Sequence, residues 1–251
     1  MNPPPTLPWP YPLWIAHRGA GRLAPENTLA AMREGARHGY RAFECDVKLS
    51  ADGVPFLLHD ATLERTTDGR GDAGALAWAE LSRLDAGGWH SRTYAGEPPA
   101  TLAAVAAFAR ANGFAMNLEL KPSPGRERET GEAVSAQAER LWAGAAPPPL
   151  LSSFRPEALA GAQAAAPALP RALLLEHAYE GWLDIARSLG CVAVVAQHGL
   201  IDAGFVASVR TAGMRTLSYT VNEAALAQQL IGLGVEGLIT DAVDRFSPAA
   251  V

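Results

Sequence analysis

The sequence predicts an α/β fold, and within that class a (β/α)8 TIM barrel. Short apolar runs alternate with helical patterns from Trp14 to Thr240, an order typical of a parallel sheet covered by helices. Eight such units suit a chain of 251 residues. A doubly wound open sheet is the alternative. We favour the barrel because the residues capable of chemistry fall at the carboxyl ends of strands, where barrel active sites form.

The predicted strands are short and apolar, and apolar residues recur at helical spacing between them. The strands are Trp14–His17, Ala42–Leu49, Phe114–Leu120, Leu150–Ser153, Arg171–Leu175, Cys191–Ala196, Thr216–Val221 and Gly237–Thr240. The helices are Thr28–His38, Leu102–Ala111, Gly131–Trp142, Pro156–Ala165, Glu180–Leu189, Asp202–Ala212 and Glu223–Leu233.

Glycines mark where these helices end. Gly39, Gly113, Gly190, Gly213 and Gly234 each stand between a predicted helix and the next strand. A helix commonly ends on a residue with a left-handed backbone, which glycine adopts without steric cost. The repeated position of glycine therefore supports the alternation of helices and strands.

One segment breaks the alternation. Residues of about 62–99 follow the second strand and are rich in Gly and Asp, with a short helix expected at Ala77–Leu84. The segment is too long for an ordinary loop between strand and helix, so we interpret it as an insertion that caps the barrel mouth. Val54–His59 is expected to form an extra strand, which the Asp52-Gly53 turn joins to the second barrel strand as a hairpin.

The composition is typical of a globular enzyme, and we expect a single domain that spans residues 1–251. The apolar fraction is 49%, the charged fraction is 19% and the net charge is −5, with no basic run. A nucleic-acid partner is therefore not indicated. Two cysteines favour reduced thiols in the cytoplasm. The proline-rich N-terminus resembles neither a leader nor an anchor, and no apolar run reaches the ~20 residues that span a bilayer.

Carboxylates gather at the ends of two predicted strands. Glu44 and Asp46 are two residues apart, so their side chains point to one face of a strand, and Glu119 ends another apolar run. Buried carboxylates without a counter-charge are costly, and Lys121 neutralises one acid rather than three. Three oxygen ligands suit Mg²⁺ or Ca²⁺, while the lack of a His and Cys cluster disfavours zinc.

Histidines complete the pattern. His17 ends the first strand and His59 ends the hairpin strand, next to an Asp60 that either orients a histidine or caps a turn. Two histidines beside a hard divalent metal are typical of phosphate-ester hydrolysis. In the segment that follows His17, we interpret Thr28 as a helix N-cap, Asn27 as a contact on the ligand side, and Glu26 as a partner of the metal site or of His17.

Taken together, these motifs resemble the glycerophosphodiester phosphodiesterases, and most of all the cytoplasmic bacterial members. The resemblance extends from about Trp9 to Asp244. The residues that carry it are His17-Arg18-Gly19, Pro25-Glu26-Asn27-Thr28, Glu44-x-Asp46, Leu58-His59-Asp60, Asn117-Leu118-Glu119-Leu120-Lys121-Pro122, Tyr219-Thr220-Val221-Asn222 and Thr240-Asp241.

The resemblance implies roles for eight residues. It makes Glu44, Asp46 and Glu119 the metal ligands, with Mg²⁺ or Ca²⁺ as the cofactor, and makes His17 and His59 the general acid and base. It has Arg18 and Lys121 contact the phosphate, and Tyr219, where many relatives have tryptophan, line the substrate pocket. The implied reaction hydrolyses a glycerophosphodiester to sn-glycerol 3-phosphate and an alcohol such as choline, ethanolamine or glycerol.

Three other functions are compatible with parts of the pattern. A phospholipase acting on a membrane surface would need an exposed apolar or basic rim, and the sequence has no basic cluster. An isomerase or aldolase would need Lys121 to lose its proton, which the neighbouring acids oppose. A non-catalytic binding module would be expected to lack one of the acids or histidines. We therefore expect a small-molecule substrate, no stable membrane association, and a monomer or homodimer.

Overall fold

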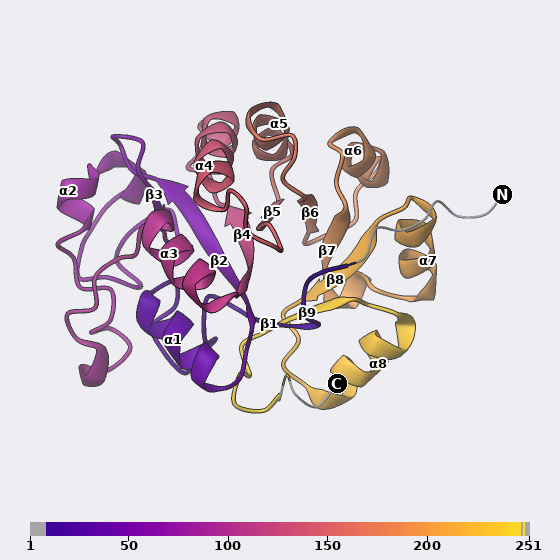
Figure 1. Cartoon of the computed structure of the whole chain (residues 1–251), viewed down its shortest axis with the longest axis horizontal. Helices are drawn as coiled ribbons and strands as arrows, with labels where there is room; N and C mark the ends of the chain where they lie inside the picture. Colours follow the sequence, from indigo (N-terminus) through magenta and orange to yellow (C-terminus); the bar gives the residue numbers. More distant parts are fainter. Residues whose placement is uncertain (1–8, 247, 249–251) are drawn as a thin grey trace.

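The structure is a computed structural model that describes residues 9–246 and 248. Its parallel strands close on themselves, because β1 (Trp14–Ala16) pairs with both β2 (Ala42–Leu49) and β9 (Gly237–Thr240). An open sheet would leave two unpaired edges, so the alternative is wrong and the (β/α)8 barrel is confirmed (Figure 1). The expectation for the N-terminus concerns mainly residues 1–8, which lie outside the described residues.

The remaining barrel strands follow in sequence order around the ring, each hydrogen-bonded to the next. They are β4 (Ala115–Leu120), β5 (Leu150–Ser153), β6 (Arg171–Leu175), β7 (Ala193–Gln197) and β8 (Arg215–Tyr219). The covering helices are α1 (Leu29–Arg37), α3 (Leu102–Asn112), α4 (Glu127–Leu141), α5 (Pro156–Ala165), α6 (Trp182–Ser188), α7 (Ala203–Thr211) and α8 (Ala224–Leu233).

Two apolar layers hold the barrel together. Alternate strand residues such as Phe43, Cys45 and Val47 face outward and pack with the helices in the larger core. The intervening residues face inward, and those nearest the amino ends of the strands, such as Ile15 and Leu217, form a smaller core inside the barrel. Because strand side chains alternate between faces, the inward positions nearest the carboxyl ends are left for the polar residues of the site.

Element boundaries differ from the predictions at several helix and strand ends, and among the barrel helices most at the start of α4. The fourth helix begins at Glu127 rather than Gly131, because Gly131 lies inside the helix where α4 packs closely on α5. A Cβ added to Gly131 would lie 1.9 Å from the carbonyl oxygen of Ala158. Strand β7 begins at Ala193 rather than Cys191, and β8 ends at Tyr219 rather than Val221. All five predicted helix-ending glycines have positive φ angles.

The predicted hairpin is present but shorter than expected. Strand β3 (Pro55–Leu57) runs antiparallel to β2, with Val47 opposite Leu57. The segment that follows contains η1 (Ala73–Ala75), α2 (Trp78–Leu81) and η2 (Arg92–Tyr94). It projects at the left of Figure 1, beside the barrel, and packs on a small core that includes Phe56, Leu63 and Leu81.

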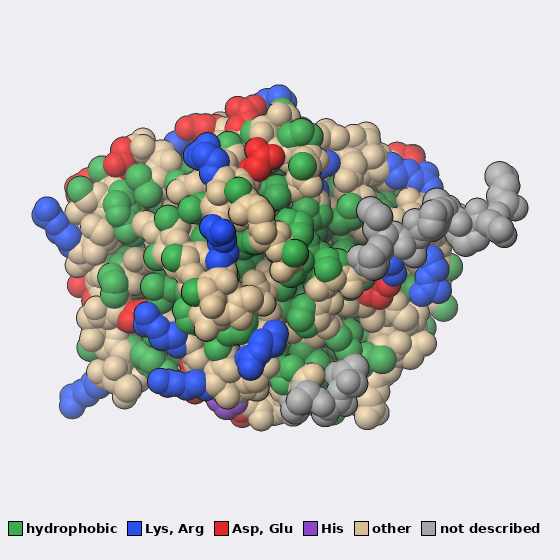
Figure 2. Space-filling view, viewed as in Figure 1, with side chains coloured by type: hydrophobic (Ala, Val, Ile, Leu, Met, Phe, Trp, Pro, Cys, Tyr) green, Lys and Arg blue, Asp and Glu red, His purple; other side chains and the backbone are tan. Residues whose placement is uncertain are grey.

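The surface carries mixed charge, and the two cysteines lie beneath it. Lysine and arginine side chains lie scattered among acidic ones on the face shown in Figure 2. No helix among the described residues has the length and apolar character needed to cross a membrane. Cys45 and Cys191 are both free thiols and both buried.

Candidate active site

A cavity of about 150 Å³ opens among the carboxyl ends of the barrel strands. Its lining contains seven of the eight site residues predicted from the sequence, while the eighth, Asp46, is 1% exposed and lies in the carboxylate cluster beside it. The lining residues are His17, Arg18, Glu44, His59, Asn117, Glu119, Lys121, Ser152, Phe154, Leu174, Tyr219, Thr220 and Ile239.

Three carboxylates converge because of strand register. Glu44 and Asp46 lie on the inward face of β2, and Asp46 stands opposite Glu119 of β4 in the parallel ladder. One carboxylate oxygen from each residue lies within 4.8 Å of the others, and all three residues are buried. The two-residue period of a β-strand predicted that Glu44 and Asp46 would share a face, and in the structure their side chains do meet there.

Charge in the cluster is not balanced by its cations. Arg18 Nε lies 3.2 Å and Lys121 Nζ 3.6 Å from Asp46, and Lys121 also donates a 2.7 Å bond to Glu119. Burial, followed by the charge of Asp46, raises the pKa of Glu44 and of Glu119. Burial opposes ionisation of Asp46 as well, but Arg18 and Lys121 hold its pKa below the usual value.

Two oxygens of the cluster have no hydrogen-bond partner. These are Glu44 Oε1 and Asp46 Oδ1, both buried. Buried oxygens without partners are rare in native proteins and often mark a bound ion or water. Clustered carboxylates that share too little positive charge are the oxygen donors that hard divalent cations prefer. The residues present therefore fit a divalent cation held by Glu44, Asp46 and Glu119.

His17 is held by Asp241, a carboxylate of the Thr240-Asp241 motif to which the sequence had assigned no role. Its Nδ1 lies 2.6 Å from Asp241 Oδ1. Asn222 in turn fixes Asp241, accepting the Asp241 backbone N–H at 2.8 Å and donating its amide to Oδ2 at 3.3 Å. Burial alone would lower the pKa of His17, but the bond to Asp241 and the charge of Glu44 raise it above the ordinary value.

His59 has a carboxylate partner of its own. Its Nδ1 lies 2.7 Å from Asp60 Oδ1, so Asp60 orients the histidine, as one of the two sequence interpretations expected. Asp60 is in turn bonded by Arg65. Burial is the main cause that lowers the pKa of His59. Each histidine therefore has its Nδ1 bonded to a carboxylate, which fixes the orientation of the ring.

The loop after β1 carries two residues in the left-handed region. Arg18 has φ +51° and Asn27 has φ +60°. Such conformations cost about 1–3 kcal/mol for residues with a side chain and concentrate at functional sites. Here they aim polar groups at the acids: the Arg18 backbone N–H donates to Glu44, and Asn27 bonds both the carboxylate and the backbone N–H of Asp46. Asn27 thus orients Asp46.

Glu26 differs from its interpretation. Its bonds go to Arg18 and Arg65 rather than to His17 or the carboxylate cluster. Thr28 is the N-cap of α1, as expected, and accepts from the Ala31 N–H at 3.1 Å. The helix also supports the loop, since a Cβ on Gly35 would lie 2.2 Å from the Gly19 carbonyl oxygen.

Several polar residues of the site were given no role from the sequence, although Asn117 and Asp241 belong to motifs of the resemblance. Asn117 and Lys48 are each two positions from a predicted ligand, so the alternation that placed Glu119 and Asp46 could have placed them as well. Lys48 is buried and donates to the Lys121 carbonyl. Asp241 follows the last strand, where a strand-end carboxylate was already visible in the sequence. Arg65, in the insertion, carried no such signal.

Known proteins similar to this chain include phosphodiesterases. Residues 17–245 match the Glycerophosphoryl diester phosphodiesterase family. A glycerophosphodiester phosphodiesterase of Caldanaerobacter subterraneus subsp. tengcongensis is 30% identical over 236 residues, which cover 91% of this chain and 93% of the relative.

Solved structures give a similar result. A phosphodiesterase of Oleispira antarctica in complex with the product sn-glycerol-3-phosphate superposes with a TM-score of 0.88 at 35% identity, covering 94% of this chain and 95% of the other. A glycerophosphodiester phosphodiesterase of Agrobacterium tumefaciens superposes with a TM-score of 0.76 at 29% identity, covering 95% and 99%.

Proposed function

The chain belongs to the glycerophosphoryl diester phosphodiesterase family, and from this premise we propose that it hydrolyses small glycerophosphodiesters with the help of a divalent cation. The products are sn-glycerol 3-phosphate and a free alcohol such as choline, ethanolamine or glycerol. The observation that carries the proposal is one cavity in which a buried carboxylate cluster adjoins two histidines, each bonded to its own carboxylate.

Glu44, Asp46 and Glu119 are the proposed ligands of Mg²⁺ or Ca²⁺. Their support is the convergence of three buried carboxylates with two oxygens that lack hydrogen-bond partners. When bound, such a cation acts as a Lewis acid that stabilises charge on a phosphate oxygen. Asn27 keeps Asp46 in place for this role through two hydrogen bonds.

His17 and His59 are the proposed acid and base. Their Nδ1 atoms are engaged by Asp241 and Asp60, so the Nε2 atoms are the ones left to exchange protons with substrate. Proton transfer by a positioned side chain typically contributes about 10²–10⁴-fold to a rate. In this proposal one histidine accepts the proton of the nucleophile, and the other protonates the departing alkoxide.

The proposed nucleophile is the glycerol 2-hydroxyl of the substrate. Its oxygen forms a bond to phosphorus while the bond to the alcohol breaks, which gives a five-membered cyclic phosphate. Water then opens the ring, and the two histidines exchange roles. Proximity favours this route over direct attack by water, because well-placed intramolecular groups reach effective molarities of about 10⁵ M or more.

Arg18 and Lys121 are the proposed phosphate contacts. Both line the cavity, and both already lie against the carboxylate cluster, so their positive charges are fixed in place before substrate arrives. Preorganised cations stabilise charge that develops on phosphoryl oxygens without reorganising during the reaction. Tyr219, whose ring packs in a T-shaped arrangement with Phe154 at 5.8 Å between ring centroids, forms a wall of the substrate pocket.

We also propose a setting for the enzyme. It acts in the cytoplasm, as one domain and as a monomer or homodimer, on soluble diesters rather than on a membrane surface. The two buried free thiols suit a reducing compartment, and a cavity of about 150 Å³ suits a glycerophosphate group better than a diacyl lipid.

Product analysis tests the proposal. Glycerophosphocholine is incubated with the purified chain, with Mg²⁺ or Ca²⁺ and separately with excess EDTA, and the products are identified by ³¹P NMR. We expect sn-glycerol 3-phosphate and choline with metal, and none with chelator. Release of phosphocholine, or turnover of phospholipid vesicles in preference to the soluble diester, would contradict it.

A further inference from the structure

Arg65, in the insertion, binds two carboxylates at once. Its Nε and Nη2 donate to the two oxygens of Asp60 at 2.6 and 3.0 Å, and its Nη1 and Nη2 donate to the two oxygens of Glu26 at 2.8 Å each. The guanidinium is planar, with donors in a fixed fork, so two bidentate contacts determine both the distance and the orientation between the carboxylates.

Each of these carboxylates holds a residue of the proposed site. Asp60 bonds His59 Nδ1 at 2.7 Å, and Glu26 accepts from Arg18 Nη1 at 2.8 Å. Arg65 therefore stands at the centre of a continuous chain of hydrogen bonds from His59 to Arg18. Hydrogen bonds from Arg65 are the main cause of the low pKa of Asp60. Burial opposes ionisation of Glu26, but Arg65 and Arg18 still lower its pKa.

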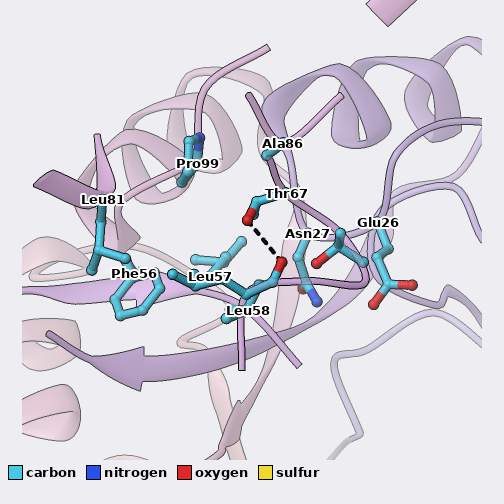
Figure 3. A pocket seen from close by; sticks show the side chains of 11 residues that line it. Glu26, Asn27, Phe56, Leu57, Leu58, Thr67, Leu81, Ala86 and Pro99 are labelled. Carbon is cyan, nitrogen blue, oxygen red and sulfur yellow. Dashed lines mark hydrogen bonds between the residues drawn. The ribbon is translucent and has the colours of Figure 1, made fainter. Parts of the chain in front are cut away.

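The turn that carries Arg65 is itself fixed to the protein. The backbone N–H and the hydroxyl of Thr67 both donate to the Leu63 carbonyl, at 3.0 and 2.7 Å. Leu63 is 1% exposed and packs in the small core of the insertion. Figure 3 shows the hydrogen bond of Thr67 as a dashed line, with Glu26 and Asn27 at one end of the same pocket.

We propose that Arg65 is a positioning residue, which sets His59 and Arg18 relative to each other by binding Asp60 and Glu26 together. This inference rests on the proposed function for the roles of His59 and Arg18. It gives the insertion a part in the reaction, because the insertion supplies the group that joins a proton-transfer residue to a phosphate-binding one.

A purely structural role makes a different prediction. The Arg65 side chain is 45% exposed, and exposed ion pairs typically stabilise a fold by about 0–1 kcal/mol. Loss of Arg65 would then change stability slightly and activity not at all. Misplacement of a reacting group by about 1 Å, by contrast, can cost about 10²-fold in rate. If Arg65 is a positioning residue, its loss should therefore lower activity strongly while changing stability only slightly.

The experiment compares Arg65→Met and Arg65→Lys with Arg83→Met, an exposed arginine of the same insertion. We measure kcat and KM on glycerophosphocholine, Mn²⁺ affinity by calorimetry, and the thermal midpoint. We expect Arg65→Met to lose about 10–100-fold in kcat with unchanged Mn²⁺ affinity, and Arg65→Lys to recover only part, because an ammonium cannot make two bidentate contacts. Arg83→Met should match the wild type.

Two further readouts decide the interpretation. In a His59→Ala background, Arg65→Met should cost less in kcat than it does in the wild type, because the part of its effect that acts through His59 is already lost. The ¹⁵N shifts of the His59 ring should change in Arg65→Met and not in Arg83→Met, whatever the substrate proves to be. An inactive wild-type enzyme would therefore refute the proposed function alone. Unchanged kcat together with unchanged His59 shifts would overturn the role of Arg65.

Discussion

Replacement of Asp241 by Asn should remove most of the turnover while leaving the fold and the metal site intact. Asp241 accepts from the Nδ1 side of His17 at 2.6 Å, and Asn222 holds it by two further contacts. An asparagine has the same shape, so these outer contacts can persist. Its amide group, however, can donate to Nδ1, which places the ring proton on Nε2 and leaves His17 in the wrong tautomer for a base.

The size of the effect follows from the role of His17. Loss of the correct tautomer forfeits the contribution of one acid–base group, about 10²–10⁴-fold in kcat, or about 2.7–5.4 kcal/mol of barrier. KM should change little, because the ring still occupies its place. Asn222→Ala removes only the support of Asp241 and should show a smaller loss in kcat.

The assay is steady-state hydrolysis of glycerophosphocholine at saturating Mg²⁺, with the thermal midpoint and Mn²⁺ affinity measured on the same samples. Asp244→Asn is the matched control, since Asp244 is an exposed carboxylate three positions further along the chain. The reasoning fails if folded, metal-binding Asp241→Asn keeps kcat within about threefold of the wild type, a difference below 1 kcal/mol.

Four further predictions concern the metal, the histidines and the substrate. Excess EDTA should abolish turnover, and Glu119→Gln should lose both turnover and Mn²⁺ affinity in calorimetry while its circular dichroism is unchanged; activity in EDTA would contradict this. His17→Ala, His59→Ala and the double variant should show similar losses of at least about 10²-fold in kcat, whereas multiplying losses would indicate separate roles. Glycerophosphocholine, glycerophosphoethanolamine and glycerophosphoglycerol should differ in kcat/KM by no more than about tenfold, because selectivity resides in the shared glycerol half. An analogue with hydrogen at the 2-position should turn over at least about 10²-fold more slowly, and rapid quench of a His59 variant should reveal glycerol 1,2-cyclic phosphate by ³¹P NMR; its absence, with no hydrolysis of added cyclic phosphate, would favour water as nucleophile.

The barrel was predictable because its signals are local. Strand alternation and helix-ending glycines need only a few neighbouring residues, and strands such as Ala42–Leu49 and Gly237–Thr240 have the bounds that these signals predicted. The carboxylate cluster was predictable for the same reason. Glu44 and Asp46 share a face by period alone, and parallel register then aligns Asp46 with Glu119.

The partners of the histidines were predictable only in part. Asp60 is the neighbour of His59 in sequence, so its contact was one of two interpretations. Asp241 lies 224 residues from His17, and it reaches the histidine because the last strand closes against the first. Arg65 lies 39 residues from Glu26, and its position depends on how an irregular insertion folds. A local sequence pattern does not show which residues so far apart in the chain come into contact.

The two parts of the site are therefore built in different ways, and this has a consequence for how they respond to change. The carboxylate cluster stands on β2 and β4, whose ladder hydrogen bonds fix the spacing of the ligands. The histidines instead depend on loop residues, with Asp241 after β9 holding one and the Arg65 network holding the other. Substitutions that break the Arg65 network should alter proton transfer and phosphate contacts while metal affinity stays constant. Substitutions within the ladder, at positions such as Asn117 opposite Glu44, should change metal affinity first, because they lie beside the ligands on the same strands.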